Sequence, residues 1–493
     1  MIDLDPHHKD LEPTIFEISR KDRVGYQIPA SDVPEIDLES SLGSMLHRGG
    51  IPPIPALSEP QVARHFTRLS QLNFCIDTGF YPLGSCTMKY NPKINDQMAS
   101  DPDFSALHPM QDDADTQGAL ELMHSLQRYL CEYAGMDDFS LCSLAGAQGE
   151  FVGLLLIRAY LESRGETERN VILVPDSAHG TNPASAILAG FKTKEIPSDK
   201  RGLVDLAKLK EALNDQVAGL MMTNPNTLGL FEKDILEIAE AVHEAGGQLY
   251  YDGANLNAIA GVARPGDMGF DVVHINLHKT FSTPHGGGGP GGGPVGVKEH
   301  LIPFLPKPHV EKNSDGVYSL DQKNKDSIGA VSGFWGNFGI LVRAYVYLRH
   351  HGLSGIRNNS EMAVLNANYL KALLQPEFPP AYPGTCMHEF VLNLKKADTG
   401  DQRAMGVAKR LLDYGVHAPT VYFPLVVPEA AMIEPTESET PETLRNFSSI
   451  MKRVREECVE NPAIIEGAPW ETPVRKLDEV TAARNPVLIE TVG

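Results

Sequence analysis

The stretch QLYYDGANLNAIAGVARPGDMGFDVVHINLHKT, residues 248–280, contains two short apolar runs, at 248–251 and 272–277. Asp252 directly follows the first run, and Lys279 comes shortly after the second. Runs of this length, apolar at successive positions, are typical of strands buried on both faces of a parallel sheet. We therefore expect a charged residue at the carboxyl end of each of two neighbouring strands.

The same alternation extends outward from this stretch. Further apolar or β-branched runs occur at 171–174, 220–223 and 295–297, and helical patterns such as 206–213 and 233–245 lie between them. Strands that alternate with helices predict an α/β fold, with a mainly parallel sheet covered by helices on both faces.

The chain divides into three predicted parts. Residues 1–65 are rich in proline and weak in apolar periodicity, so they form either an N-terminal arm that wraps a neighbouring subunit or a partly disordered tail. Residues 66–375 form a large domain that ends in a long helix. Residues 376–493 form a smaller C-terminal α+β domain, in which a strand-like run precedes helical patterns at 402–414 and 441–461.

Composition disfavours several classes of protein. The 493 residues contain 43 Lys and Arg against 64 Asp and Glu, a formal net charge of −21, which argues against general binding to nucleic acid or anionic membranes. The six cysteines include no CxxC pair, and their sparseness fits a reducing compartment. The N-terminus lacks the apolar core of a signal peptide, and Asn337 and Arg343 interrupt the most apolar stretch, 328–348. We therefore expect a soluble, cytoplasmic protein.

Asp252 and Lys279 together indicate a pyridoxal phosphate site. This cofactor needs a lysine amine for its aldehyde and an acid beside its pyridine nitrogen, which keeps the ring able to accept electrons. Desolvation at the end of a core strand lowers the pKa of a lysine and favours its reaction with an aldehyde. Each residue alone has an ordinary explanation, a turn-capping aspartate or a lysine that reaches the rim. The pair on successive strand ends favours the cofactor.

Further cofactor contacts follow from the same reasoning. His179, just past an apolar strand, can stack on the ring, although an ordinary loop histidine is the alternative. Small residues before an apolar helix place the phosphate at Ala147 and Gln148, where a tight turn is the alternative. The remaining candidates are His278 and Thr280 for the phosphate, and Asn224 for the ring hydroxyl or a turn cap.

The glycine-rich loop HGGGGPGGGP, residues 285–294, resembles a nucleotide-binding loop only superficially. It lacks the GK[ST] ending and no helical pattern follows it, so ATP binding is disfavoured. Glycines this close to Lys279 mark either backbone that approaches another group closely or a flexible surface loop.

Long motifs extend over nearly the whole chain. They include DTGFYPLGSCTMKYNPKIN (77–95), LAGAQGEFVGLLLIRAY (144–160), HGTNPASA (179–186), YYDGANLNAI (250–259), INLHKTFSTPHGGGGPGGGPVGV (275–297), GVHAPTVYFPLVV (415–427) and TPVRKLDEVTAARNPVL (472–488). Together they resemble the P-protein of the glycine cleavage system, glycine dehydrogenase (decarboxylating). The chain length resembles the C-terminal half of the long single-chain form, which implies subunit 2 of the split bacterial form.

This resemblance implies a fold type I pyridoxal phosphate enzyme, in which Lys279 forms the aldimine, Asp252 contacts the pyridine nitrogen and His179 stacks on the ring. It implies that glycine loses its carboxylate as CO2 and that the aminomethyl group passes to the lipoyl arm of the H-protein. It also implies an α2β2 heterotetramer with P-protein subunit 1.

Two roles stay open. The candidates for moving a proton are His108, His179 and His278. The candidates for contact with the substrate carboxylate are Lys89, Arg475 and Arg484, for which ordinary surface salt bridges are the alternative.

Three other functions compete with this interpretation. A free-standing amino-acid decarboxylase of the same fold would use the same residues without a partner. A structural subunit would keep the fold and lose catalysis, which the presence of Lys279 argues against. A nucleotide-binding protein built on the glycine loop is the third.

Overall fold

The computed structural model describes residues 11–21, 23, 25, 27–47, 50, 54–286, 289–397, 399–400 and 402–488. They belong to two compact units, one drawn from residues 1–75 and 467–493 and the other from residues 76–466. The residues assigned above to the cofactor all fall in the second unit. The division into an arm, a large domain and a small C-terminal domain stays a prediction.

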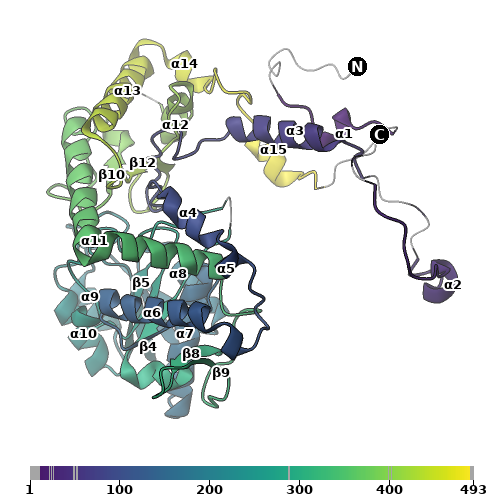
Figure 1. The fold of residues 1–493 in the computed structure, drawn as a ribbon. Helices are drawn as coiled ribbons and strands as arrows, with labels where there is room; N and C mark the ends of the chain where they lie inside the picture. Colours follow the sequence, from purple (N-terminus) through teal and green to yellow (C-terminus); the bar gives the residue numbers. More distant parts are fainter. Residues whose placement is uncertain are drawn as a thin grey trace. The chain divides into compact units, whose positions relative to one another are not determined.

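Seven strands form the central sheet of the 76–466 unit (Figure 1). Their order is β1-β7-β6-β5-β4-β2-β3. Strands β2 to β6 pair in parallel, and β7 runs antiparallel to β6 and β1. This arrangement confirms the predicted α/β fold with a mainly parallel sheet. The strands are β1 (Asp138–Ser140), β2 (Val171–Pro175), β3 (Lys192–Ile196), β4 (Val217–Met222), β5 (Gln248–Gly253), β6 (Val272–Ile275) and β7 (Val295–Val297).

Both faces of this sheet are buried, because successive residues of a strand point to opposite sides. In β5, Leu249 and Tyr251 belong to one apolar cluster, whereas Tyr250 belongs to another. Helices α6 and α10 contribute to the first cluster, and α7 and α8 to the second. The helices of these two layers are α6 (Gln117–Ala134), α7 (Gly146–Ser163), α8 (Thr181–Leu188), α9 (Leu206–Ala212) and α10 (Ile235–Glu244).

A long helix, α11 (Phe338–Leu374), leads from this region to a smaller antiparallel sheet of order β10-β12-β11. The helix is interrupted at Gly352, whose φ of 62° and ψ of −179° are not helical. Buried residues of α11, α12 and α13 share one apolar cluster with β10 and β12. The elements that follow α11 are β10 (Phe390–Asn393), α12 (Ala404–Asp413), β11 (Thr420–Val421), β12 (Ala430–Ile433), α13 (Pro441–Glu460) and α14 (Pro462–Glu466).

The remaining elements are short. The unit of residues 1–75 and 467–493 contains α1 (Ile15–Ile18), α2 (Leu38–Leu42), α3 (Glu59–Gln71) and α15 (Glu479–Arg484), with Glu12 accepting a hydrogen bond from Nε of Arg68 at 2.6 Å. The other unit also contains α4 (Lys93–Ala99), α5 (Pro102–Ser105), β8 (His309–Lys312), β9 (Tyr318–Asp321) and the 3-10 helices η2 (Asp113–Asp115), η3 (Pro265–Met268), η4 (Glu299–Phe304) and η5 (Leu394–Lys396).

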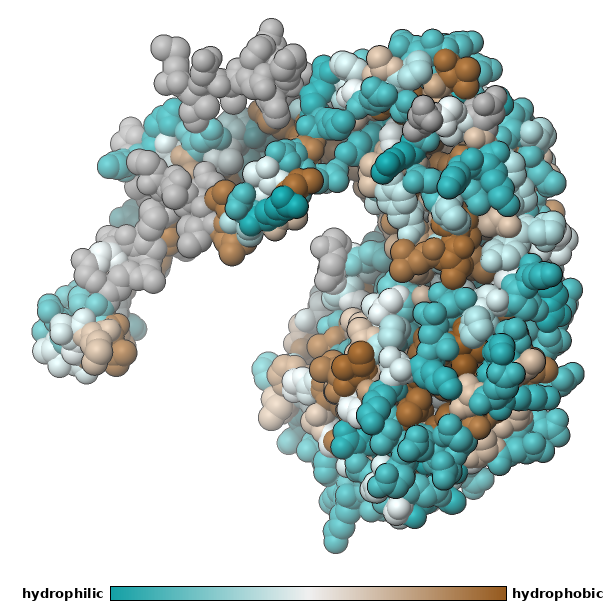
Figure 2. Space-filling view, turned by 180° about the vertical axis from the view of Figure 1, so that it is seen from behind, coloured by the Kyte–Doolittle hydropathy of each residue, from teal (hydrophilic) through white to brown (hydrophobic). Residues whose placement is uncertain are grey.

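Hydrophilic side chains predominate on the face seen in Figure 2, and apolar side chains gather there in separate patches. Within the described part of the chain, no helix has both the length and the apolar character needed to cross a membrane.

Candidate active site

A cavity of about 290 Å³ lies in the 76–466 unit, where β2, β4, β5 and β6 end. Ligand sites of open parallel sheets occur at this carboxyl edge. The cavity brings together five of the eight residues considered for the cofactor: Lys279, Asp252, His179, His278 and Ala147. Its wall also contains Ser85, Cys86, Gly146, Glu150, Asn276, His285, His388 and Glu389.

Lys279 follows β6, and its side chain reaches the segment 81–90. Its Nζ donates a hydrogen bond to the carbonyl oxygen of Ser85 at 2.6 Å. Ser85 and Thr87 both have left-handed backbone conformations, with φ of 66° and 49°. Such conformations are strained for residues other than glycine and persist where the surrounding structure enforces them. The segment therefore presents a main-chain oxygen to the amine at a defined position.

Asp252, the penultimate residue of β5, is buried against three partners. Its Oδ2 accepts a hydrogen bond from Nδ2 of Asn182 at 2.7 Å, and its Oδ1 accepts one from the amide of Ala254 at 3.0 Å. Nε2 of His274 lies 3.3 Å from Oδ1. Burial by itself raises the pKa of Asp252, but His274 and these donors outweigh it and bring that pKa below its ordinary value. The carboxylate is therefore ionised at neutral pH.

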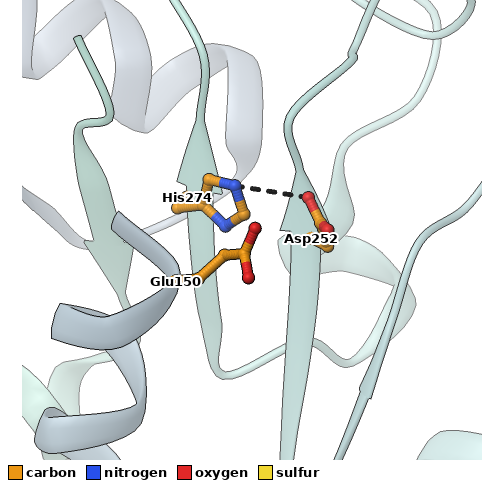
Figure 3. A group of neighbouring side chains, drawn as sticks. All are labelled: Glu150, Asp252 and His274. Atoms are coloured by element: carbon orange, nitrogen blue, oxygen red, sulfur yellow. Dashed lines mark ion pairs between the residues drawn. The ribbon is translucent and has the colours of Figure 1, made fainter. Parts of the chain in front are cut away.

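Glu150 and His274 were not predicted from the sequence. Figure 3 shows both side chains directed toward Asp252, Glu150 from α7 and His274 from β6. Glu150 accepts hydrogen bonds from the hydroxyls of Thr181 at 2.7 Å and Ser185 at 3.0 Å. Burial, and then the neighbouring Asp252, raises the pKa of Glu150. A single glutamate inside the apolar stretch of α7 was the signal that could have identified it.

The two predicted histidines are uncharged at neutral pH. Desolvation by the surrounding protein lowers the pKa of His179, although its ring stays accessible at the cavity. The ring lies edge-on to Phe423, at 5.3 Å between centroids. Desolvation, together with His285 and Lys279, lowers the pKa of His278 to about 3. Neutral imidazoles at these places can stack on a ring or donate a hydrogen bond, and they do not add charge to the site.

The N-terminus of α7 forms the end of the cavity at Gly146 and Ala147. Among the described residues no side chain caps this helix start, so its first amide groups are free to bind an anion. Uncapped amides that face a cavity fit a phosphate-bearing cofactor.

Two predicted contacts lie outside the cavity wall. Oε1 of Gln148 accepts a hydrogen bond from the amide of Leu144 at 2.7 Å, and its Nε2 donates to the Val331 carbonyl at 2.6 Å. Oδ1 of Asn224 accepts a hydrogen bond from the amide of Glu232 at 2.8 Å. Their side chains thus stabilise local backbone in this structure, and their assignment to the cofactor stays a prediction.

The structure also shows where the remaining candidate residues lie. Lys89 is buried, and its Nζ lies 2.8 Å from Oε1 of Glu437. The hydroxyl of Thr280 accepts a hydrogen bond from the Leu256 amide. His108 lines a different cavity. Arg475 and Arg484 belong to the unit of residues 1–75 and 467–493.

The glycines after Lys279 make close backbone contacts. A Cβ on Gly293 would overlap the carbonyl oxygen of Ala145, directly before α7, and a Cβ on Gly291 would press on the ring of His278. The described part of the loop therefore supports the close-approach interpretation. Residues 287 and 288 lie outside the described residues.

Two family profiles match this sequence. The profile described as "Glycine cleavage system P-protein" matches residues 36–315, and the profile described as "Glycine dehydrogenase, C-terminal domain" matches residues 359–470. A protein of Caldanaerobacter subterraneus subsp. tengcongensis named "Probable glycine dehydrogenase (decarboxylating) subunit 2" is 58% identical over 97% of this chain and 99% of its own length. A protein of the same name in Thermosipho africanus is 55% identical over 96% of this chain and 98% of its own length.

Solved structures share the fold at low sequence identity. A glycine decarboxylase (P-protein) of the glycine cleavage system, in inhibitor-bound form, superimposes with a TM-score of 0.71 at 23% identity, over 85% of this chain and 94% of its own. A glutamate decarboxylase from Lactobacillus brevis gives a TM-score of 0.64 at 14% identity, over 87% of this chain and 96% of its own. These likenesses support the architecture of the large sheet and the region that follows it.

Proposed function

The chain belongs to the glycine cleavage system P-protein family, and from that premise we propose that it is a glycine dehydrogenase (decarboxylating) subunit 2. Its fold is that of the fold type I pyridoxal phosphate enzymes, as predicted, and the family depends on pyridoxal phosphate. One observation extends the proposal to individual residues. A lysine amine and an ionised, buried aspartate line the same cavity of about 290 Å³.

The residues of the cavity fit this cofactor. Lys279 would hold its aldehyde, Asp252 its pyridine nitrogen, and the amides at the start of α7, with Ala147, its phosphate. His179 would lie against the ring. When bound, pyridoxal phosphate supplies the aldehyde that takes up an amino group and the ring that accepts the electron pair left by a departing carboxylate.

The chain's own side chains control orientation and charge. Asn182, His274 and the amide of Ala254 fix the carboxylate of Asp252, so that it can keep a proton on a nitrogen placed beside it. The carbonyl of Ser85 positions the amine of Lys279. Because both groups are set before substrate enters, little reorganisation is needed during the reaction.

The reaction proposed is decarboxylation of glycine, with transfer of the aminomethyl group to the lipoyl arm of the H-protein. The relatives are named subunit 2, which supports assembly with a subunit 1, and an α2β2 heterotetramer in the cytoplasm is part of the proposal. The chain covers nearly the full length of these relatives.

Reduction of the cofactor bond tests the proposal. The purified chain, alone and mixed with subunit 1, is incubated with pyridoxal phosphate, examined by visible absorption, reduced with borohydride and mapped by peptide analysis. We expect an absorption band and a reduced adduct on Lys279. Lys279→Ala should remove both, whereas Lys192→Ala, on the exposed edge strand β3, should change neither. A full adduct on another lysine would refute the assignment.

The partner requirement is tested with the same samples. We expect release of CO2 from glycine only when subunit 1 and lipoylated H-protein are present. Equal activity of the chain alone would favour a free-standing decarboxylase. An absence of the band in both samples would favour a structural subunit.

A further inference from the structure

A second pair of acids, Glu389 and Glu434, lies at the smaller sheet, and Glu389 lines the cavity. Glu389 directly precedes β10 and Glu434 directly follows β12, and because Phe390 pairs with Ile433, the two glutamates are neighbours across the strand pair. Their carboxylate oxygens and a ring nitrogen of His388 all lie within 4.8 Å of one another. All three side chains are buried, and Glu389 and His388 reach the cavity.

The hydrogen bonds around this pair come from neutral donors. Glu389 accepts one from the amide of Ser85 at 2.8 Å. Glu434 accepts one at each oxygen from Thr87, from the hydroxyl at 2.8 Å and the amide at 3.1 Å, and another from Nδ2 of Asn255 at 3.1 Å. These contacts fix the carboxyl groups and do not neutralise a second negative charge.

The titratable groups that face the pair are Lys279, His388, Cys86 and Cys386. Burial lowers the pKa of His388 to about 3, and burial raises the pKa of each thiol, so these three groups are neutral near pH 7. The Lys279 amine favours negative charge on either carboxyl group. Two buried carboxyl groups this close cannot both ionise, so one of them keeps its proton.

Ser85 connects this pair to the reacting lysine. Its carbonyl oxygen accepts the hydrogen bond of Lys279 Nζ, and its amide donates to Glu389. A substrate amine that replaces the lysine would therefore lie on the same side of the cavity as Glu389. Asp252 accepts bonds from a different set of donors and stays ionised.

The proposed reaction consumes one proton. The bond between the glycine carbon atoms breaks, CO2 leaves, and the electron pair forms a bond from the remaining carbon to one sulfur of the lipoyl disulfide. The S–S bond breaks, and the second sulfur departs with its electron pair as a thiolate that needs a proton. Carbon is oxidised and the disulfide is reduced, so no other oxidant is required.

We propose that Glu389 is the acid that gives this proton to the departing sulfur, a role that rests on the proposed function. Glu434 keeps Glu389 in its protonated form. The O–H bond of the Glu389 carboxyl breaks, an S–H bond forms, and the carboxylate regains a proton from water before the next turnover. Glu389 is the catalytic member because it reaches the cavity, and Glu434 is a positioning residue behind it.

Two carboxylates and an imidazole are also metal ligands, but the Lys279 amine beside them favours a proton over a metal ion in this cluster. Lys279, which acts on both glutamates, would add electrostatic repulsion.

Infrared difference spectroscopy tests the protonation without the reaction. The full chain is labelled with ¹³C at its glutamate carboxyl groups and titrated through neutral pH. Other buried glutamates, such as Glu150, also have raised pKa values, so we expect several protonated carboxyl signals above the ordinary glutamate range. One of these signals should be lost in Glu389→Gln and in Glu434→Gln. Glu442→Gln is the control, because Glu442 is exposed at the start of α13 with a lowered pKa, and it should leave all the signals unchanged. The same set of signals in wild type, in Glu389→Gln and in Glu434→Gln would overturn the proposal.

Turnover with subunit 1 and lipoylated H-protein tests the donor role. We expect Glu389→Gln to lower kcat by roughly 100-fold, the size of a lost general acid, while the glycine-induced change of the cofactor band stays at wild type. Glu389→Asp should recover part of kcat. The fall of wild-type kcat with rising pH should be absent in Glu389→Gln.

The outcomes separate the two proposals. Wild-type kcat and pH dependence in Glu389→Gln would exclude the donor role and leave glycine decarboxylation intact. A wild-type enzyme that does not decarboxylate glycine would instead exclude the proposed function. If Glu389→Gln does not fold, the infrared signal in Glu434→Gln and kcat in Glu389→Asp still decide the question.

Discussion

Nε2 of His274 lies 3.3 Å from Oδ1 of Asp252, and the two residues are register partners on β6 and β5. Nδ1 of His274 lies 3.0 Å from the hydroxyl of Tyr250, whose oxygen in turn lies 3.1 Å from the carbonyl oxygen of Gly149 in α7. This chain of contacts fixes the imidazole beside the carboxylate. It is one reason why an acid in the interior of the sheet stays ionised.

Replacing His274 should therefore shift the acid limb of activity. His274 lowers the pKa of Asp252, so His274→Leu should raise that pKa, and Asp252 should take up its proton at a higher pH. We expect the acid limb of the pH–rate profile to move upward. His243→Gln, which disrupts a histidine–aspartate contact to Asp271 outside the cavity wall, is the control and should leave the limb in place. An unshifted limb in His274→Leu would exclude this role.

Asp252→Asn should keep the cofactor and lose catalysis. Asparagine has nearly the same shape, but its amide cannot stabilise a protonated pyridine nitrogen. We expect an intact absorption band and a fall of kcat of roughly 100-fold or more, the size of a lost electrostatic contact in a buried site. Asp199→Asn, at a surface turn with Arg201, should behave as wild type. Unchanged turnover in Asp252→Asn would remove Asp252 from the mechanism.

The buried ion pair between Lys89 and Glu437 should stabilise the folded chain. Nζ of Lys89 also donates hydrogen bonds to the Thr280 carbonyl at 2.7 Å and to Oδ1 of Asn257 at 3.2 Å. Lys89→Met would leave Glu437 largely buried without its cation, which costs about 3–5 kcal/mol of the free energy of unfolding. Denaturant titration measures this value. The double variant Lys89→Met with Glu437→Gln should recover part of the lost free energy of unfolding. If the double variant loses as much as Lys89→Met alone, the two residues do not act as a pair.

Stability should fall as pH rises through neutrality. Burial raises the pKa of Glu389 and of Glu434 in the folded chain above the ordinary value of 4.5, and repulsion from Glu434 adds to the rise at Glu389. The folded state then binds more protons than the unfolded state, so the free energy of unfolding is greatest below that ordinary value and decreases as pH rises through the folded pKa values. Glu389→Gln should flatten this decrease, as measured by denaturant midpoints across pH. An unchanged slope would show that the pair does not share a proton.

Particular residues show how far the sequence could predict the fold. Strands β5 and β6 were predicted, at 248–251 and 272–277, because apolar residues fill successive positions there, and the structure has them at 248–253 and 272–275. Strands β1 and β3 were not predicted. Strand β1 is only Asp138–Ser140, and β3 reads KTKEI, with charged side chains at the edge of the sheet. An edge strand is buried on fewer sides, so its pattern is weaker.

The candidate site was likewise predicted only in part. Lys279, Asp252, His179, His278 and Ala147 were predicted and lie around one cavity. The side chains of Gln148 and Asn224 instead bond to nearby backbone, since amides compete for local hydrogen bonds as readily as for a ligand. Glu389 and Glu434 carried no recognisable signal, because each is a single acid next to a short strand.

By itself the sequence determined that a parallel sheet would carry a lysine and an acid on neighbouring strand ends, because periodicity and residue chemistry are local properties of the chain. Only the tertiary structure decided the charge of the groups around them. Ser85 meets Glu389 and Lys279, and Glu434 meets Thr87, across hundreds of positions in the chain. Protonation depends on burial and on the distance between charges, and both arise only when distant segments pack together.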